Sequence, residues 1–454
     1  MEDLQSSKMR HMNIKKLLFS MSLPTIFSMF VQALYNIVDT MYVSQYSPDK
    51  GVEALAIAFP LQTVILAIFL GIGVGANAQI AKKLGANKKE EATATAKNCV
   101  FITLIAIAFF IIIGLLIPNT FMKLFTRDET VISMGTIYLQ IVSCFAFGWG
   151  IQIALEKILQ STGNMKAPMI AQLIGALTNI ILDPIFIFTL KLGITGAAVA
   201  TIIGQFAAMF FLILQFFIRK QDVSVNIFKH FNPSFQVFKK IMRVGLPTML
   251  MNSLASVTTT ALNGILGVYP NGIRLLGIYF KLQSFVFMPI FGLMQGALPI
   301  MSYNYGYNDK KRFDECYKLS IIISLLIMVI GTIIFQCFPT VFLKLFNVEG
   351  EALFLGIICL RIISISFIPA SFNVVNMTAF QAIGNGLHGL ILSLLRQLIV
   401  LLPAAYLLSL ISLNASWWCY SISEYITALI FVPLSLILIK KKFSYQSLYR
   451  SSLH

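Results

Sequence analysis

Apolar stretches long enough to cross a membrane follow one another along almost the whole chain, and they constrain the fold more than any other feature. A membrane-spanning helix needs roughly 20 predominantly apolar residues. Hydrophobic residues make up 57% of the 454 positions and the mean hydropathy is +0.82, which excludes a soluble globular protein of this length. We therefore predict an all-α polytopic membrane protein with about twelve spans. Their approximate limits are 14–43, 53–81, 96–118, 131–160, 167–190, 194–218, 239–267, 273–303, 317–338, 351–382, 387–411 and 415–439.

Lysine and arginine residues gather in every second connection between the predicted spans. The net charge is +16, from 34 basic and 18 acidic residues. Basic residues concentrate in the connections that stay on the cytoplasmic side of a membrane. We therefore predict that both termini are cytoplasmic, and that the positive charge reflects membrane orientation and not a nucleic-acid partner. The scattered cysteines and histidines lack the spacing of a metal site.

The second half of the chain repeats the first. One constant offset of 221 (292 minus 71) relates many marker residues. They include Gly71 and Gly292, Gly75 and Gly296, Asn87 and Asn308, and Gly163 and Gly384. Each half has an even number of spans, so both enter the membrane from the same side as parallel repeats. We predict an N-terminal lobe at 1–218, a cytoplasmic linker at 219–238 and a C-terminal lobe at 239–454, around a central cavity.

The first span carries a polar face. Gln32, Tyr35 and Asp39 are three or four residues apart, so they lie on one side of a helix. A carboxylate at membrane depth costs about 2.5–3.5 kcal/mol by insertion scales, so such a group usually faces a cavity and has a function. The alternative is that Asp39 lies at the outer interface as a solvated helix end.

The fifth and sixth spans carry a second polar group. Asn179 and Asp183 share one face of the fifth span, and Thr201 lies on the sixth. With Asp39 they supply two carboxylates, an amide and a hydroxyl, which suit a proton or a small hard cation such as Na⁺. Two desolvated carboxylates close together should share a proton. The alternative is that Asp183 caps a kink at Pro184 and that Asn179 only holds helices together.

Polar residues in other spans are weaker candidates. On the seventh and tenth spans we interpret them as cavity wall, with helix–helix hydrogen bonding as the alternative. These residues are Asn252, Ser256, Asn373 and Asn376. Glu156 and Glu424 are further embedded acids. Glu156 is a candidate for the substrate cavity or for a pair with Lys157, and Arg396 is a candidate to neutralise an acid.

Four motifs together resemble one known family. They are "SMSLPTIFSMFVQALYNIVDTMYV", "GIGVGANAQIAKKLGA", "LQSTGNMKAPM" and "NIILDPIFIF". The chain resembles the multidrug and toxic compound extrusion (MATE) transporters, in the bacterial multidrug efflux subgroup. The resemblance implies two six-helix lobes and drug export from the bacterial cytoplasmic membrane, driven by proton or sodium entry. It also implies a cation site at Asp39, Asn179, Asp183 and Thr201, and drug contacts at Gln32 and Tyr35.

We therefore expect an antiporter that exports lipophilic, often cationic drugs in exchange for H⁺ or Na⁺ by alternating access. We expect no cofactor beyond the coupling ion, no metal beyond a possible Na⁺, and a monomer in the bilayer. The alternative within the membrane is a flippase for a lipid-linked sugar precursor, which usually favours a cationic cavity. An enzyme would need a nucleophile–base pair or a metal cluster, and the sequence shows no such cluster.

Overall fold

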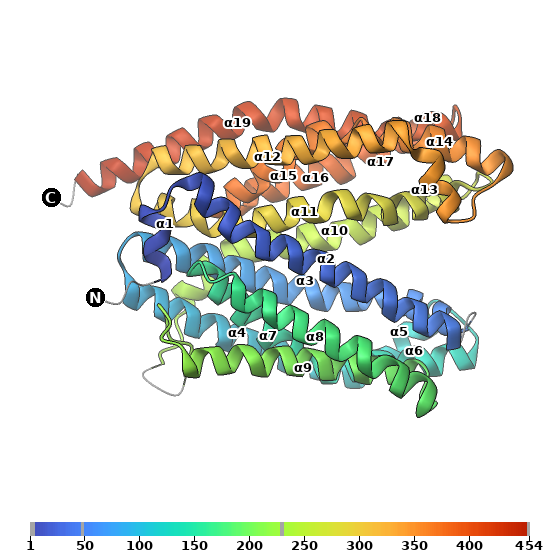
Figure 1. The fold of residues 1–454 in the computed structure, drawn as a ribbon, viewed down its shortest axis with the longest axis horizontal. Helices are drawn as coiled ribbons and strands as arrows, with labels where there is room; N and C mark the ends of the chain where they lie inside the picture. Colours follow the sequence, from blue (N-terminus) through green and yellow to red (C-terminus); the bar gives the residue numbers. More distant parts are fainter. Residues whose placement is uncertain (1–4, 47–49, 228–230, 452–454) are drawn as a thin grey trace. The chain divides into compact units, whose positions relative to one another are not determined.

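The computed structural model describes residues 5–46, 50–227 and 231–451, and all of their regular structure is helical. The extreme termini, whose cytoplasmic location we predicted, lie outside the described residues. Figure 1 shows the helices coloured along the chain. The elements up to the linker are η1 (Gln5–Ser7), α1 (Lys8–His11), α2 (Ile14–Tyr46), α3 (Lys50–Gly85), α4 (Lys89–Leu116), α5 (Pro118–Lys123), α6 (Glu129–Cys144), α7 (Ala146–Ser161), α8 (Lys166–Pro184), η2 (Ile185–Thr189) and α9 (Ile194–Ile218).

The elements after the linker follow a similar order. They are α10 (Phe235–Leu266), α11 (Gly272–Tyr307), α12 (Lys310–Cys337), α13 (Pro339–Leu345), α14 (Gly350–Ser364), α15 (Phe367–Ala382), α16 (Gly386–Leu394), η3 (Leu395–Leu401), α17 (Leu402–Ser409), α18 (Leu413–Ser416) and α19 (Trp418–Ser451). The predicted all-α class is confirmed for the described part of the chain. Both η2 and η3 are π-helical turns.

Nine helices of the described residues are long and apolar enough to cross a membrane, and two bent helix pairs bring the number to eleven. The remaining predicted span, 239–267, lies on α10. This helix has 32 residues, and at about 1.5 Å per residue it exceeds the roughly 30 Å of a bilayer core. It carries a polar stripe that includes Asn252 and Ser256.

The repeat is visible in the backbone. α6 and α7 meet at a bend of 46°, and so do α14 and α15. Asn87 and Asn308, which the offset of 221 relates, both adopt positive φ angles, of 61° and 71°. Gly163 and Gly384 do the same, with φ angles of 89° and 75°. Few residues adopt this left-handed conformation, so its recurrence at matched positions shows that the two halves share their turns.

The described residues form two compact units that exchange helix segments. The first unit extends to His11 and then from Phe27 to Met249, and the second comprises Met12–Ile26 and the chain from Leu250 onward. The first part of α2 therefore belongs to the second unit, and the first part of α10 belongs to the first unit. The lobe boundaries expected from the sequence, at 218 and 239, stay a prediction.

Glycines at corresponding positions of the repeat leave room for the exchanged helix segments. A Cβ atom on Gly75 of α3 would lie 2.4 Å from the carbonyl oxygen of Ile241 on α10. A Cβ atom on Gly296 of α11 would lie 2.5 Å from the hydroxyl of Ser22 on α2. Both separations are too short for any side chain, so these helix contacts require glycine. The offset of 221 relates the two glycines, so the exchange is reciprocal.

The N-terminal segment is fastened to the first unit. The ammonium of Lys8 donates a hydrogen bond to the Gly163 carbonyl at 2.6 Å, and the backbone N–H of Ser6 donates to the Asp222 carboxylate at 2.7 Å. Burial lowers the pKa of Lys8. The Met12 carbonyl, which belongs to the second unit, accepts from the Arg312 guanidinium at 2.7 Å. The short stretch from Lys8 to Met12 thus joins a residue that is hydrogen-bonded within the first unit to one that is hydrogen-bonded within the second.

Candidate functional site

Helices α8 and α9 approach each other closely because both carry glycine at the contact. A Cβ atom on Gly204 would lie 2.6 Å from the carbonyl oxygen of Gly175, so α9 has no room for a side chain there, and a Cβ atom on Gly175 would make a tight contact of 3.2 Å with the Gly204 carbonyl oxygen. Gly175 lies one turn before Asn179 on α8, and Gly204 lies one turn after Thr201 on α9. The close approach therefore brings the side chain of Asn179 within reach of α9.

Asn179 joins two of the predicted cation ligands. Its side-chain amide donates to Asp183 Oδ1 at 3.1 Å and to Thr201 Oγ1 at 3.4 Å. All three residues are buried, and Asp183 is 0% exposed. The carbonyl oxygen of Asn179 and the second carboxylate oxygen of Asp183 have no hydrogen-bond partner within residues 5–46, 50–227 and 231–451. The cluster thus presents oxygen acceptors that the described protein atoms leave open.

Pro184 ends α8 directly after Asp183. Proline has no N–H group, so it cannot continue the backbone hydrogen bonding of the helix, and the π-helical turn η2 follows. The backbone then closes a wider ring, from the N–H of Leu190 to the carbonyl of Ile185 at 2.9 Å. The hydrogen bond found on the Asp183 carboxylate comes from Asn179. The first part of the alternative, that Asp183 caps the kink, gains no support from these contacts. The second part expected Asn179 to hold helices together, and its bond to Thr201 of α9 is such a contact.

Asp39 lies on α2 near the same cluster. Its Oδ1 atom is buried without a hydrogen-bond partner in the described protein. Asp39 and Asp183 are close enough for their charges to interact, and Asp39 also acts electrostatically on Tyr35 of the same helix. Gln32 is half-buried on α2. The structure thus places Asp39, Asp183, Asn179 and Thr201 in one region of the first unit.

Tyr138 is a member of this region that the sequence analysis missed. It lies on α6, it is buried, and both Asp39 and Asp183 act on it electrostatically. Its hydroxyl donates to Gln62 Oε1 on α3 at 3.4 Å. Tyr138 belongs to an apolar cluster with residues of α3, α6 and α9. A single tyrosine in an apolar span carries no spacing signal, so the sequence alone could not identify it.

The predicted cavity residues of the second half have different surroundings. Asn252 is exposed and Ser256 is half-buried on α10. Asn376 is buried on α15, where its Oδ1 accepts from the Tyr317 hydroxyl at 2.6 Å. Asn373 is also buried and donates to Glu424 and Thr427 of α19. Both asparagines of α15 therefore make the helix–helix hydrogen bonds that we held as the alternative, and their contact with a cavity stays a prediction.

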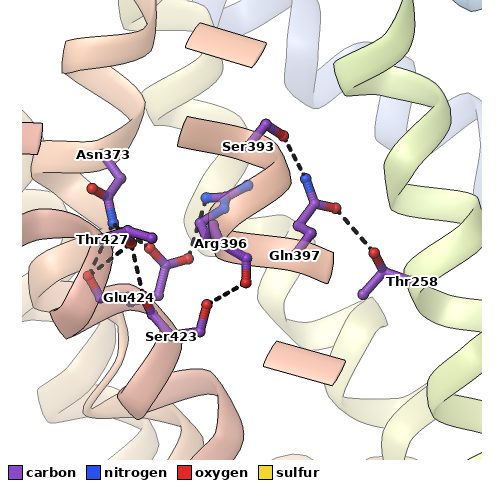
Figure 2. A network of polar contacts seen from close by, with 8 residues as sticks. All are labelled: Thr258, Asn373, Ser393, Arg396, Gln397, Ser423, Glu424 and Thr427. Carbon is purple, nitrogen blue, oxygen red and sulfur yellow. Dashed lines mark hydrogen bonds and ion pairs between the residues drawn. The ribbon is translucent and has the colours of Figure 1, made fainter. Parts of the chain in front are cut away.

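Two ion pairs lie among the embedded residues. Lys157 Nζ is 3.0 Å from Glu156 Oε1 and also donates to Gln160 at 3.1 Å. This confirms the pair that the sequence suggested. In the second unit, Arg396 Nη1 is 3.2 Å from Glu424 Oε1 (Figure 2). Each embedded glutamate therefore has a cationic partner, whereas the hydrogen bond found on Asp183 comes from a neutral amide.

Comparison with known proteins connects this arrangement to one family. A family model described as MatE matches residues 24–185 and 233–407. The chain is 26% identical over 430 residues to the multidrug export protein MepA of Staphylococcus haemolyticus (strain JCSC1435), with 94% of each chain covered. It is 26% identical over 437 residues to MepA of Staphylococcus aureus (strain MRSA252), with 94% of this chain and 95% of that protein covered.

Solved structures agree with this family. The chain is similar, with a TM-score of 0.92 and 25% identity, to an outward-facing multidrug resistance MATE family transporter of the MOP superfamily, and the match covers 97% of this chain and 99% of that one. The same values describe its similarity to a MOP superfamily transporter from Pyrococcus furiosus Vc1.

Proposed function

This chain belongs to the MatE family of membrane transporters, and from that premise we propose that it exports lipophilic, often cationic drugs in exchange for H⁺ or Na⁺. The MepA proteins that it resembles are multidrug export proteins. We propose the bacterial cytoplasmic membrane as its location, with both termini cytoplasmic, because basic residues fill the connections on that side. We further propose that it works as a monomer, and that it needs no cofactor besides the coupling ion.

One observation carries this proposal: the buried carboxylate of Asp183 has an open oxygen beside a second acid. Asp183 is 0% exposed, one of its oxygens has no hydrogen-bond partner among the described residues, and the hydrogen bond on the other comes from the neutral amide of Asn179. An ionised carboxylate in such a place is costly unless a cation joins it. Asp39 adds a second acid whose charge interacts with Asp183. A proton or Na⁺ at this cluster would offset both the burial of the ionised carboxylate and the repulsion between the two acids.

The coupling follows from competition or from differential affinity. In the outward-open state, a cation binds Asp39 and Asp183, and this loading displaces the drug or favours the state that releases it. After the return to the inward-open state, the cation leaves and another drug molecule binds. Each ligand must favour a different state, or compete for one state, for the two movements to be coupled. One charge that moves across 100 mV supplies about 2.3 kcal/mol, which supports a gradient of roughly 50-fold.

Drug contact is proposed along the face of α2 that leads to Asp39. Gln32 and Tyr35 precede Asp39 by two turns and one turn, and both are half-buried. Glu156, Asn252, Ser256, Asn373 and Asn376 stay proposed cavity residues. A chamber lined by aromatic residues, methionines and a few acids would accept flat lipophilic cations through apolar contact and cation–π attraction.

The test is drug uptake by everted vesicles that contain Asp39→Asn, compared with the wild type. We expect uptake driven by a proton or sodium gradient to fall to the level of empty vesicles, because the variant cannot carry the exchangeable charge. Asp128→Asn is the matched control, since Asp128 is a carboxylate of the same unit that lies outside the spans. Undiminished gradient-dependent uptake by Asp39→Asn would rule out the role that we give to this acid. Collapsing the pH and sodium gradients separately identifies the ion.

A further inference from the structure

The second unit contains a polar cluster with the same chemistry as the one beside Asp39. We call Asn179, Asp183 and Thr201 the first cluster, and Asn373, Glu424 and Thr427 the second cluster. In each, an asparagine amide donates to one carboxylate oxygen and to one threonine hydroxyl. In the second cluster these distances are 2.7 Å to Glu424 Oε2 and 2.9 Å to Thr427 Oγ1 (Figure 2). The carbonyl oxygens of Asn179 and Asn373 are both buried without a partner in the described protein.

The internal repeat does not explain this similarity. The first cluster combines α8 and α9, whereas the second combines α15 and α19. The offset of 221 relates Asp183 to Ala404, which is not part of the second cluster. The two units therefore present the same set of oxygen ligands from different elements. This set is a carboxylate, an amide oxygen and a hydroxyl. Such hard oxygen donors suit a compact monovalent cation.

The two clusters differ at the second carboxylate oxygen. Among the residues that the structure describes, Asp183 Oδ2 has no hydrogen-bond partner, whereas Glu424 Oε1 accepts from Arg396 Nη1 at 3.2 Å. Arg396 lies in the π-helical turn η3, and Figure 2 shows its guanidinium directed at Glu424 while Gln397 is directed at Thr258 of α10. The turn thus presents two consecutive polar side chains to two different helices. A π-helical turn often marks a functional position.

Arg396 is not held in the way that a purely structural arginine is usually held. A strong arginine–carboxylate pair is bidentate, with two parallel hydrogen bonds. Here one nitrogen contacts Glu424, and the Nε atom is buried without a hydrogen-bond partner in the described part of the chain. The Arg396 and Glu424 side chains keep 19% and 13% of their exposure, whereas Asn373 and Thr427 are 0% exposed. The guanidinium therefore contacts the cluster at the Glu424 carboxylate, without a complete set of hydrogen bonds.

The helix contact at this place does not itself need charges. The offset of 221 relates Arg396 to Gly175 and Tyr425 to Gly204. In the first unit, both of these positions are glycines, which bring α8 and α9 together without a charged side chain at either position. The second unit places an ion pair at the corresponding level. A charged pair in a membrane span is costly, so its presence calls for a reason beyond packing.

We propose that Asn373, Glu424 and Thr427 form a second cation-binding cluster, and that the Arg396 guanidinium is its resident cation, tethered by the chain in place of a free ion. The inference rests on the proposed function for one premise, which is that the first cluster is a cation site. Because Arg396 cannot leave, the second cluster does not exchange an ion during transport. The coupling ion is then carried by the first cluster alone.

The test is chemical rescue of purified Arg396→Ala, at constant pH and ionic strength. Guanidinium chloride in the millimolar range is the probe, with choline chloride as the matched salt, and the readout is the thermal unfolding midpoint. We expect guanidinium to raise the midpoint of Arg396→Ala in a saturable way, because a ligand that binds only the folded state stabilises it. Wild type and the double variant Arg396→Ala/Glu424→Gln should show no such rise. An equal response of the single and double variants overturns the proposal.

A second pair of variants decides the matter if Arg396→Ala does not fold. Arg396→Lys keeps a tethered cation but not the guanidinium plane, and Arg396→Met keeps neither. We expect the melting midpoint of the lysine variant to stay close to wild type and that of the methionine variant to fall. Equal midpoints for the two variants would show that the charge does not matter. These readouts involve no transport, so they are independent of the result for Asp39→Asn.

Discussion

The amide of Asn179 donates to the carboxylate of Asp183 one turn later on α8, at 3.1 Å, and this bond leaves the other oxygen of Asp183 buried and open. The same amide reaches Thr201 on α9. The geometry therefore depends on two things: the separation of α8 from α9, and the hydroxyl that α9 supplies. Each can be changed by a single substitution.

Gly204→Ala should push α8 and α9 apart. The added methyl group would lie 2.6 Å from the Gly175 carbonyl oxygen, and backbone atoms must shift to admit it. We expect a loss of about 1–3 kcal/mol in the free energy of unfolding, as for other overpacked sites, together with a loss of drug export. Gly264→Ala is the control, because a Cβ atom there meets no atom of the described residues within 4 Å. Thermal unfolding of both purified variants measures the difference, and equal midpoints would contradict the close packing.

Thr201→Val should reduce ion-driven transport much more than it reduces stability. The valine keeps the shape of the side chain but removes the hydroxyl that accepts from Asn179 and that we assign to the cation. We expect stability to fall by about 1 kcal/mol or less, whereas ion-driven export falls several-fold. Thr103→Val is the control, since Thr103 is a buried threonine that donates to the Cys99 carbonyl of its own helix. Export that survives in Thr201→Val at the level of Thr103→Val would remove Thr201 from the ion site.

Lys157→Met should be far more damaging than the double variant Glu156→Gln/Lys157→Met. Lys157 is 4% exposed and Glu156 is 16% exposed, so removing the ammonium leaves a largely buried carboxylate without its cationic partner, although the Gln160 amide still donates to it. Breaking one side of a buried pair costs about 3–5 kcal/mol, whereas replacing both sides is often nearly neutral. Expression level, thermal unfolding and drug export of the two variants measure this. If the stable double variant still fails to export drug, the Glu156–Lys157 pair has a role in transport beyond stability.

Asp128 provides a pH-dependent contribution outside the spans. The Lys50 ammonium, 2.8 Å away, lowers the pKa of Asp128 to about 2, helped by the backbone N–H groups of Thr130 and Val131. A carboxyl with a lowered native pKa stabilises the folded state above its unfolded value of 3.8, and this contribution disappears as the pH falls toward 2. Wild type should therefore unfold at a higher temperature than Asp128→Ala at pH 7, and the difference should shrink below pH 4. Asp128→Asn should lie between them, because asparagine still caps α6.

Much of the fold could be predicted because hydrophobic length and repeat spacing are local signals. The predicted span 14–43 lies within α2, and 194–218 has the same limits as α9. The offset found in the sequence reappears as matched bends and matched left-handed residues. The exchange of helix segments between the two units was not predicted. It depends on tertiary contacts at Gly75 and Gly296, and the sequence shows those glycines without showing what they face.

Part of the candidate site could also be predicted from the sequence. Helical spacing placed Asn179 beside Asp183, and the structure brings Thr201 to them. Spacing could not reveal that Asn373 contacts Glu424, because these residues belong to different helices of the second unit. Spacing also could not identify the partner of Arg396, since a charged residue in a span indicates only that some counter-ion must be present.

The exchange of segments between the units has a consequence for biosynthesis. The first unit includes the beginning of α10, up to Met249, so a ribosome that has released only the first half of the chain has not yet supplied all of that unit. A cut in the linker would likewise yield two fragments, each of which retains a piece of the other's core. Such fragments should assemble when they are produced together and be degraded when either is produced alone.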